Sequence, residues 1–181
     1  DNRYGSPLET DAKGRQKPAE LCIVSLGKLG SRELNYSSDI DLLFLYSGEG
    51  STSGIGSRGS ISNREYFIKL AVAVVRIVGS QSGEGSAYRV DLRLRPHGKI
   101  GPLAMSVAET VSYYENEARP WERQVLIRSR CSSGAEWLFR SFFQQVEATV
   151  FPPDESVEEA LRNVRESKQK IDIKQINTNG I

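Results

Sequence analysis

Apolar residues follow two different periods in the first hundred residues of this chain. Residues 21–26 and 39–46 are short runs rich in strand-forming side chains, and they predict buried strands. Residues 88–95 alternate between apolar and charged side chains, which predicts a further strand with one polar face. Between these strands, apolar residues recur at helical spacing over 67–78, after a capping sequence that begins at Ser62, and they predict a helix.

Beyond about residue 100 only the helical period remains. Apolar stripes predict helices over 107–118, 121–128, 139–150 and 157–171. A second capping sequence, Ser-x-x-Glu, begins at Ser106 and marks the start of the first of these helices. The order of elements therefore predicts an α+β fold, in which a small mixed sheet with helices is followed by the start of a helical domain.

This pattern divides the chain into a polar arm at 1–19, an α+β core at 20–104 and a helical extension at 105–181. Residues 47–62 are rich in glycine and serine, so we expect them to form a mobile loop beside a cleft. The chain begins with neither a methionine nor an apolar leader, and we expect it to be a piece of a longer protein.

Composition excludes several classes of protein. With 38% hydrophobic residues the chain can bury a core, and no apolar run is long enough to cross a membrane. The 24 basic and 23 acidic residues nearly balance, which argues against a nucleic-acid binder held by bulk charge. Two cysteines cannot form a disulfide scaffold, and one histidine makes a zinc site unfavourable, so we expect reduced thiols and a cytoplasmic location.

The Asp39-Ile40-Asp41 sequence carries the sharpest chemical signal. Residues i and i+2 of a strand point to the same side, where two carboxylates repel by roughly 0.5 kcal/mol in water and about 2–3 kcal/mol at a dielectric near 20. A divalent cation would turn this repulsion into attraction, and oxygen ligands suit Mg²⁺ or Mn²⁺. An exposed, solvated pair of carboxylates at a strand end is the plainer interpretation of these two residues alone.

A third carboxylate, Asp91, lies on the polar face of the predicted strand at 88–95. If the two strands are neighbours, Asp91 joins Asp39 and Asp41, and we expect the three to converge within metal-bridging distance. Arg93 and Arg95 would then point toward a phosphate, because arginine forks match phosphate oxygens. A surface strand with alternating ion pairs is the alternative.

A glycine turn, Gly27-Lys28-Leu29-Gly30-Ser31, follows the first strand and precedes a short helix predicted within 29–35. Such a turn presents backbone N–H groups to an anion, although it matches neither a P-loop nor a dinucleotide fingerprint. Taken alone, it could equally be a tight connection between strand and helix.

Together these features resemble the polymerase-beta-like nucleotidyltransferase superfamily, in which a glycine turn precedes Asp-x-Asp and a third carboxylate follows on a later strand. The flanking sequences are similar to those of the glutamine synthetase adenylyltransferase family, whose members add and remove AMP. The runs that carry this resemblance are Leu26–Leu42, Arg89–Gly98, Gly101–Leu103, Tyr113–Glu115 and Trp121–Gln124.

The resemblance implies a polymerase-beta-like fold and a two-metal nucleotidyl transfer. Asp39, Asp41 and Asp91 would be the catalytic and metal-binding residues, with Mg²⁺ or Mn²⁺. The groups that would bind the ATP or ADP phosphates are Gly27, Lys28, Gly30, Ser31, Ser38, Arg93 and Arg95. Ser31 stands where the family usually has a second glycine, but a serine can still offer a hydroxyl and a backbone N–H.

The resemblance also implies partners: glutamine synthetase, modified on a tyrosine, and a nitrogen-signalling regulatory protein that acts through the longer enzyme, with no nucleic acid and no membrane. The Ala118–Arg123 run is more similar to the copy that removes AMP, using phosphate, than to the copy that attaches it. Two alternatives remain open: a catalytically silent nucleotide-binding regulatory module of the same fold, and a nucleic-acid polymerizing relative, which the near-neutral charge disfavours.

Overall fold

The computed structural model describes residues 3–11, 13–36, 38–82, 85–86 and 88–152, together with 162 and 165. Its strands are β1 Pro7–Thr10, β2 Gln16–Pro18, β3 Leu21–Leu26, β4 Ile40–Tyr46, β5 Gly50–Thr52, β6 Gln81–Ser82, β7 Gly85–Ser86, β8 Val90–Asp91, β9 Ala104–Ser106 and β10 Arg130–Gly134. Its helices are α1 Gly27–Gly30, α2 Asn63–Val78, α3 Val107–Asn116, α4 Pro120–Val125 and α5 Glu136–Val150, with short 3₁₀ turns η1 Gly98–Ile100 and η2 Leu126–Arg128.

The central sheet is mixed, as the sequence predicts. Its strand order is β10-β3-β4-β8, and β9 also pairs with β4. β3 runs antiparallel to both β10 and β4, whereas β8 and β9 run parallel to β4. β3 and β4 are apolar at nearly every position because helices cover both of their faces.

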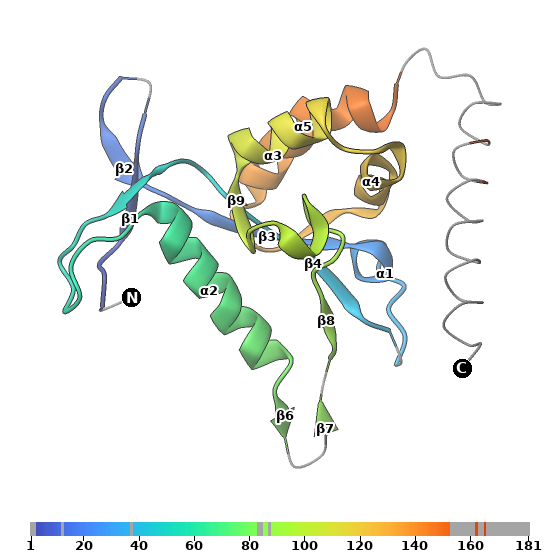
Figure 1. Cartoon of the computed structure of the whole chain (residues 1–181), viewed down its shortest axis with the longest axis horizontal. Coiled ribbons are helices and arrows are strands. Elements are labelled where there is room, and N and C mark those ends of the chain that lie inside the picture. Colours follow the sequence, from blue (N-terminus) through green and yellow to red (C-terminus); the bar gives the residue numbers. More distant parts are fainter. Residues whose placement is uncertain are drawn as a thin grey trace.

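Helices on the two faces of the sheet build two separate cores. On one face, alternate β4 residues such as Leu42 and Phe44 pack against Phe67 and Ala71 of α2. On the other face, Leu43 and Leu45 meet α3 and α5, which lie side by side (Figure 1). The period-2 alternation of a central strand thus distributes its side chains between two helical layers.

At both predicted capping sequences, the serine forms its N-cap hydrogen bond. The Ser62 hydroxyl accepts a hydrogen bond from the Glu65 N–H at 3.1 Å at the start of α2. The Ser106 hydroxyl accepts one from the Glu109 N–H at 3.3 Å at the start of α3. Each satisfies one of the N–H groups that a helix leaves without a partner at its beginning.

Several predicted elements are wrong in extent. The polar arm at 1–19 contains β1 and β2, which form a small sheet with β5 of order β2-β1-β5. The strand predicted over 88–95 is paired only at Val90–Asp91, because the chain turns before Pro96. The helix predicted within 29–35 is the four-residue α1. The helix predicted over 157–171 lies outside the described residues, apart from Arg162 and Arg165.

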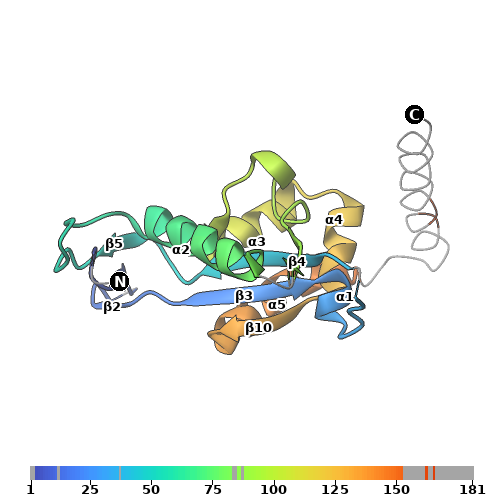
Figure 2. The same ribbon diagram turned by 90° about the horizontal axis from the view of Figure 1, so that it is seen from below.

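The loop predicted at 47–62 does not lie beside the carboxylates. Its backbone is paired with the N-terminal segment: Ser53 N–H donates to the Ser6 carbonyl at 2.8 Å, and Gly54 N–H donates to the Tyr4 carbonyl at 3.1 Å. Figure 2 shows β5 and β2 at one end of the molecule and α1 at the other. The prediction is wrong because hydrogen bonding to distant residues leaves no mark in local composition.

The chain after residue 100 is also not purely helical. β9 and β10 belong to the same central sheet as β3 and β4. The boundary predicted at residue 104 therefore falls inside this sheet, and α3 and α5 cover its face instead of opening a second domain. The five-residue β10 reads Arg-Cys-Ser-Ser-Gly, which has little strand character, and long-range pairing with β3 determines its conformation.

Candidate active site

Parallel strands bring two of the predicted acidic residues together. β4 and β8 pair so that Asp41 and Asp91 are direct neighbours in register. Asp39 precedes β4 by one residue and carries the third carboxylate. The prediction that Asp41 and Asp91 lie on neighbouring strands of one sheet is therefore confirmed.

The surroundings of Asp41 disfavour the ionised form of its carboxyl. Burial of its carboxyl raises its pKa from 3.8 to about 6, and the negative charges of Asp91 and Asp39 add to the rise, while Arg93 opposes it. A carboxylate in such surroundings gains from any cation that approaches it. The charges of Asp39 and Asp91 thus make the electrostatic potential at Asp41 negative, which favours the binding of a cation there.

Arginines from β8 and its flanks hold the other two carboxylates. The Arg89 guanidinium forms an ion pair with Asp39, with Nη2 donating to Oδ2 at 2.8 Å. Arg93 donates to Asp91 twice, from its backbone N–H at 2.8 Å and from Nε at 2.7 Å. Burial raises the pKa of Asp91, but these hydrogen bonds and the Arg93 charge outweigh it and bring the pKa below 3.8.

These ion pairs decide how the carboxylates are arranged. Among the described residues, no group of three or more His, Cys, Asp or Glu side chains is arranged as a ready set of metal ligands. The prediction that Asp39, Asp41 and Asp91 converge within metal-bridging distance is therefore wrong for this arrangement, because the outer two carboxylates turn to Arg89 and Arg93. Both arginine side chains are largely exposed, at 80% and 64%, so they are free to swing toward solvent.

The chemistry of the donors nevertheless fits a divalent cation. Asp41 and Asp91 offer carboxylate oxygens from adjacent backbones, and oxygen ligands are those that Mg²⁺ and Mn²⁺ prefer. The main chain of Gly27 also leaves room beside them. A Cβ added to Gly27 would lie 2.8 Å from the Asp41 Oδ2 atom, and the residue has a φ of +55°. Only glycine brings the turn this close to the carboxylate.

Polar side chains link the glycine turn to Ser38, the residue before Asp39. The Lys28 Nζ donates to the Ser38 hydroxyl at 3.3 Å, and that hydroxyl donates to Asn35. The Ser31 hydroxyl donates to the Gly27 carbonyl at 3.0 Å, so it closes the turn on itself. Lys28 is exposed, whereas Gly30 is buried at the end of α1.

Arg95 has a different surrounding from the one predicted. Its side chain is buried, and all three guanidinium nitrogens donate to main-chain carbonyls, including Leu92 at 2.6 Å and Gly101 at 2.9 Å. This side chain holds the turn of residues 92–102 together. Its guanidinium group is used in these hydrogen bonds and does not face the carboxylates as Arg93 does. The assignment of Arg95 to a phosphate is corrected for this reason.

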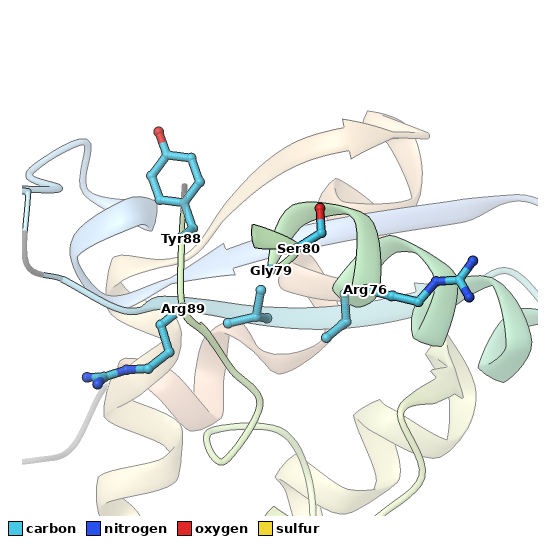
Figure 3. A pocket seen from close by; sticks show the side chains of 7 residues that line it. Arg76, Gly79, Ser80, Tyr88 and Arg89 are labelled. Carbon is cyan, nitrogen blue, oxygen red and sulfur yellow. The ribbon is translucent and has the colours of Figure 1, made fainter. Parts of the chain in front are cut away.

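An open depression adjoins this site at the edge of the sheet (Figure 3). It has a volume of about 520 Å³. It lies between the end of α2 and β8, and its lining residues are Val75, Arg76, Gly79, Ser80, Tyr88, Arg89 and Val90. The Arg89 side chain joins this depression to Asp39 through the ion pair described above.

Comparison with known proteins shows which family the chain resembles. A sequence model of the glutamate–ammonia ligase adenylyltransferase family matches residues 2–145. The chain belongs to this family.

Relatives named bifunctional glutamine synthetase adenylyltransferase/adenylyl-removing enzyme occur in several bacteria. The protein of Thioalkalivibrio sulfidiphilus is 40% identical over 149 residues, which are 82% of this chain and 15% of the relative. That of Nitrosococcus oceani is 45% identical over 118 residues, 65% of this chain and 12% of the relative. That of Vibrio parahaemolyticus is 44% identical over 127 residues, which are 70% of this chain and 13% of the relative. The chain therefore spans only about an eighth to a seventh of these adenylyltransferases.

Membership of the adenylyltransferase family confirms the resemblance found in the sequence. Within the described part of the chain, no helix combines the length and the hydrophobicity needed to cross a bilayer. Sequence reasoning did not find Arg128 and Arg130, which contact the glycine turn from about a hundred residues away. Their position depends on the pairing of β10 with β3, and no local pattern announces it.

Proposed function

We propose that this chain is the nucleotidyl-transfer unit of a longer enzyme that adds or removes AMP on a tyrosine of glutamine synthetase. The observation that carries the proposal is the in-register pair of Asp41 and Asp91 beside the main chain of Gly27. Family membership and the printed names of the relatives support the substrate. The similarity of Ala118–Arg123 to the removing copy favours the phosphorolytic direction, with phosphate as acceptor and ADP as product.

Asp39, Asp41 and Asp91 would hold two divalent ions, Mg²⁺ or Mn²⁺, which supply Lewis-acid chemistry at the phosphoryl group when bound. To expose these oxygens, Arg89 and Arg93 must release Asp39 and Asp91. Since both guanidinium groups end in solvent, their release requires rotation of side chains only.

Cationic side chains of this chain would then bind the phosphates. Arg93, freed from Asp91, would bind phosphate oxygens with its planar fork and balance charge that develops in the transition state. Gly27, Gly30 and Ser31 of the glycine turn, with the Lys28 ammonium and the Ser38 hydroxyl, would form the other side of the proposed phosphate site. Gly27 of this turn lies against Asp41.

The longer enzyme would work in the cytoplasm and respond to a nitrogen-signalling regulatory protein. The free, reduced state of Cys22 and Cys131 suits that location.

The test is an assay of the intact protein in both directions, with ATP on unmodified glutamine synthetase and with phosphate on adenylylated glutamine synthetase. We expect Mg²⁺-dependent turnover, most of it in the removing direction, that Asp41→Asn reduces by several orders of magnitude. Asp11→Asn is the matched control, because Asp11 lies in the β1–β2 turn and pairs with Lys13 and Arg15 there. It should keep wild-type turnover.

Two outcomes would contradict the proposal. Wild-type turnover in Asp41→Asn would remove the carboxylates from the chemistry. Nucleotide binding without turnover in either direction would favour a catalytically silent nucleotide-binding module.

A further inference from the structure

The glycine turn rests against η2, the 3₁₀ turn that ends two residues before β10. A Cβ added to Gly30 would lie 1.8 Å from the Arg128 carbonyl oxygen and 2.7 Å from the Ser25 carbonyl oxygen. The two main chains are therefore in direct contact at Gly30, and any side chain there would separate them. This contact joins parts of the sequence that lie about a hundred residues apart.

The Arg130 side chain fastens this contact. Its Nη2 donates to the Leu29 carbonyl at 3.1 Å, and its Nε donates to the Gly30 carbonyl at 3.3 Å. These carbonyls are at the end of α1, where a helix has acceptors to spare and favours a positive charge. The side chain is half-buried, which strengthens hydrogen bonds from a charged donor.

Arg128 adds a second contact to the same turn. Its Nη2 donates to the Ser31 hydroxyl at 2.7 Å, and the same group pairs with Glu33. Unlike Arg130, this side chain contacts side chains and is about half exposed. Of these two arginines, Arg130 is the one that binds the main chain of the turn.

The opposite end of the turn meets the carboxylate cluster. Gly27 lies against Asp41, and Gly30 lies against Arg128, with only Lys28 and Leu29 between them. A turn this short transmits a displacement at one end to the other. The place where the turn is held on β10 therefore fixes its distance from Asp41.

We propose that Arg130 is a positioning residue, which holds the Gly27–Ser31 turn in a preorganised place beside Asp41. This inference rests on the proposed function, in which the glycine turn binds the nucleotide phosphates. Preorganised donors bind a phosphate better than donors that must first be ordered. Lysine cannot replace the arginine fully, since a single ammonium lacks the planar fork that reaches both carbonyls.

The first measurement is amide hydrogen exchange in the intact protein, which needs no turnover. Within the turn, Ser31, Arg32 and Glu33 donate their N–H groups to the carbonyls of Gly27, Leu29 and Lys28. In Arg130→Met, we expect these amides to exchange about tenfold faster, and in Arg130→Lys by an intermediate factor. Exchange in β4 should not change. Arg140→Met is the control, because Arg140 pairs with Glu136 on the exposed side of α5.

The second measurement separates KM for the nucleotide or phosphate substrate from kcat. We expect Arg130→Met to raise KM about tenfold, with a smaller effect on kcat, and Arg130→Lys to recover part of the loss. A residue that only stabilises the fold would lower the amount of active protein and leave KM unchanged. If Arg130→Met does not fold, Arg130→Lys carries both measurements.

Unchanged exchange over residues 31–33 in the Arg130 variants would overturn the inference, as would faster exchange with an unchanged KM. If the wild-type protein shows no turnover, the proposed function fails instead, and the exchange measurement still decides whether Arg130 holds the turn.

Discussion

At the scale of single residues, the positions of the acidic residues were predictable from the sequence, whereas the positions of the arginines around them were not. The same-side geometry of Asp39 and Asp41 follows from strand periodicity, and the polar face of the next strand supplied Asp91. The sequence could not tell which arginines face these acids. Arg89 and Arg93 do, whereas Arg95 is buried among carbonyls, because the chain leaves the sheet after Asp91 and the alternation ends there.

The stability of the protein without metal should depend on the ionisation of Asp41. The pKa of this carboxyl is about 6 in the folded chain against 3.8 for an ordinary one, so the folded state holds the proton longer. The contribution of Asp41 to stability is therefore greatest when this carboxyl is protonated, and it falls as pH rises from about 4 through 6. An asparagine does not ionise, so Asp41→Asn should not lose stability in this way. In a chelating buffer its melting temperature should be higher than that of the wild type, and the difference should grow as pH rises. A constant difference across this range would contradict the raised pKa.

The two thiols should differ in reactivity. Cys22 is fully buried, and its thiol donates to the Cys131 sulfur at 3.5 Å. Burial and the hydrogen bond with Cys131 raise the pKa of Cys22, so almost no thiolate is present at neutral pH. We expect iodoacetamide to label Cys131 well before Cys22 in the folded protein, as read by peptide mass spectrometry. Equal rates under native conditions, as in urea, would show that Cys22 is not shielded.

At the scale of elements, local patterns predicted the long helices and the apolar strands. α2, α3, β3 and β4 follow from period and capping alone. The short elements that complete the site do not. α1, β8 and β10 are defined by what they contact, because a four-residue turn or a two-residue strand has too few side chains to carry a period.

The glycine turn can be tested with a pair of matched substitutions. Gly27→Ala and Gly59→Ala both place a side chain at positive φ, +55° and +72°, and each should cost roughly 1–2 kcal/mol of stability in urea unfolding. Around Gly59 a Cβ meets nothing within 4 Å, whereas at Gly27 it meets Asp41. We therefore expect only Gly27→Ala to lose nucleotide affinity as well. Equal affinity in the two variants would separate the turn from the site.

At the scale of the whole molecule, one mixed sheet of β3, β4, β8, β9 and β10 has helices on both faces, and β5 belongs to the separate small sheet with β1 and β2. The α+β class was predictable, because strand and helix patterns are mixed in the first hundred residues and helical patterns follow them. The extent of the unit was not. β9 and β10 return to the sheet after the apparent end of the strand region, and this return depends on long-range pairing with β4 and β3.

Truncation tests this architecture. A chain that ends at residue 104 lacks β10, α3 and α5, and it exposes the apolar face of β3 and β4 that holds Val24 and Leu45. We expect it to lose cooperative thermal unfolding, as followed by circular dichroism, whereas a chain that ends at residue 152 should keep it. A cooperative transition in the shorter chain would restore a domain boundary at residue 104.

The central claim is that Asp39, Asp41 and Asp91 bind divalent metal once Arg89 and Arg93 release them. Titration of the intact protein with Mn²⁺ in the presence of ADP, followed by electron paramagnetic resonance, tests it most directly. We expect saturable Mn²⁺ binding in the wild type and in Asp11→Asn, and at least about tenfold weaker binding in Asp41→Asn, since the change removes one charged ligand oxygen. Equal Mn²⁺ binding by the wild type and Asp41→Asn would contradict the claim.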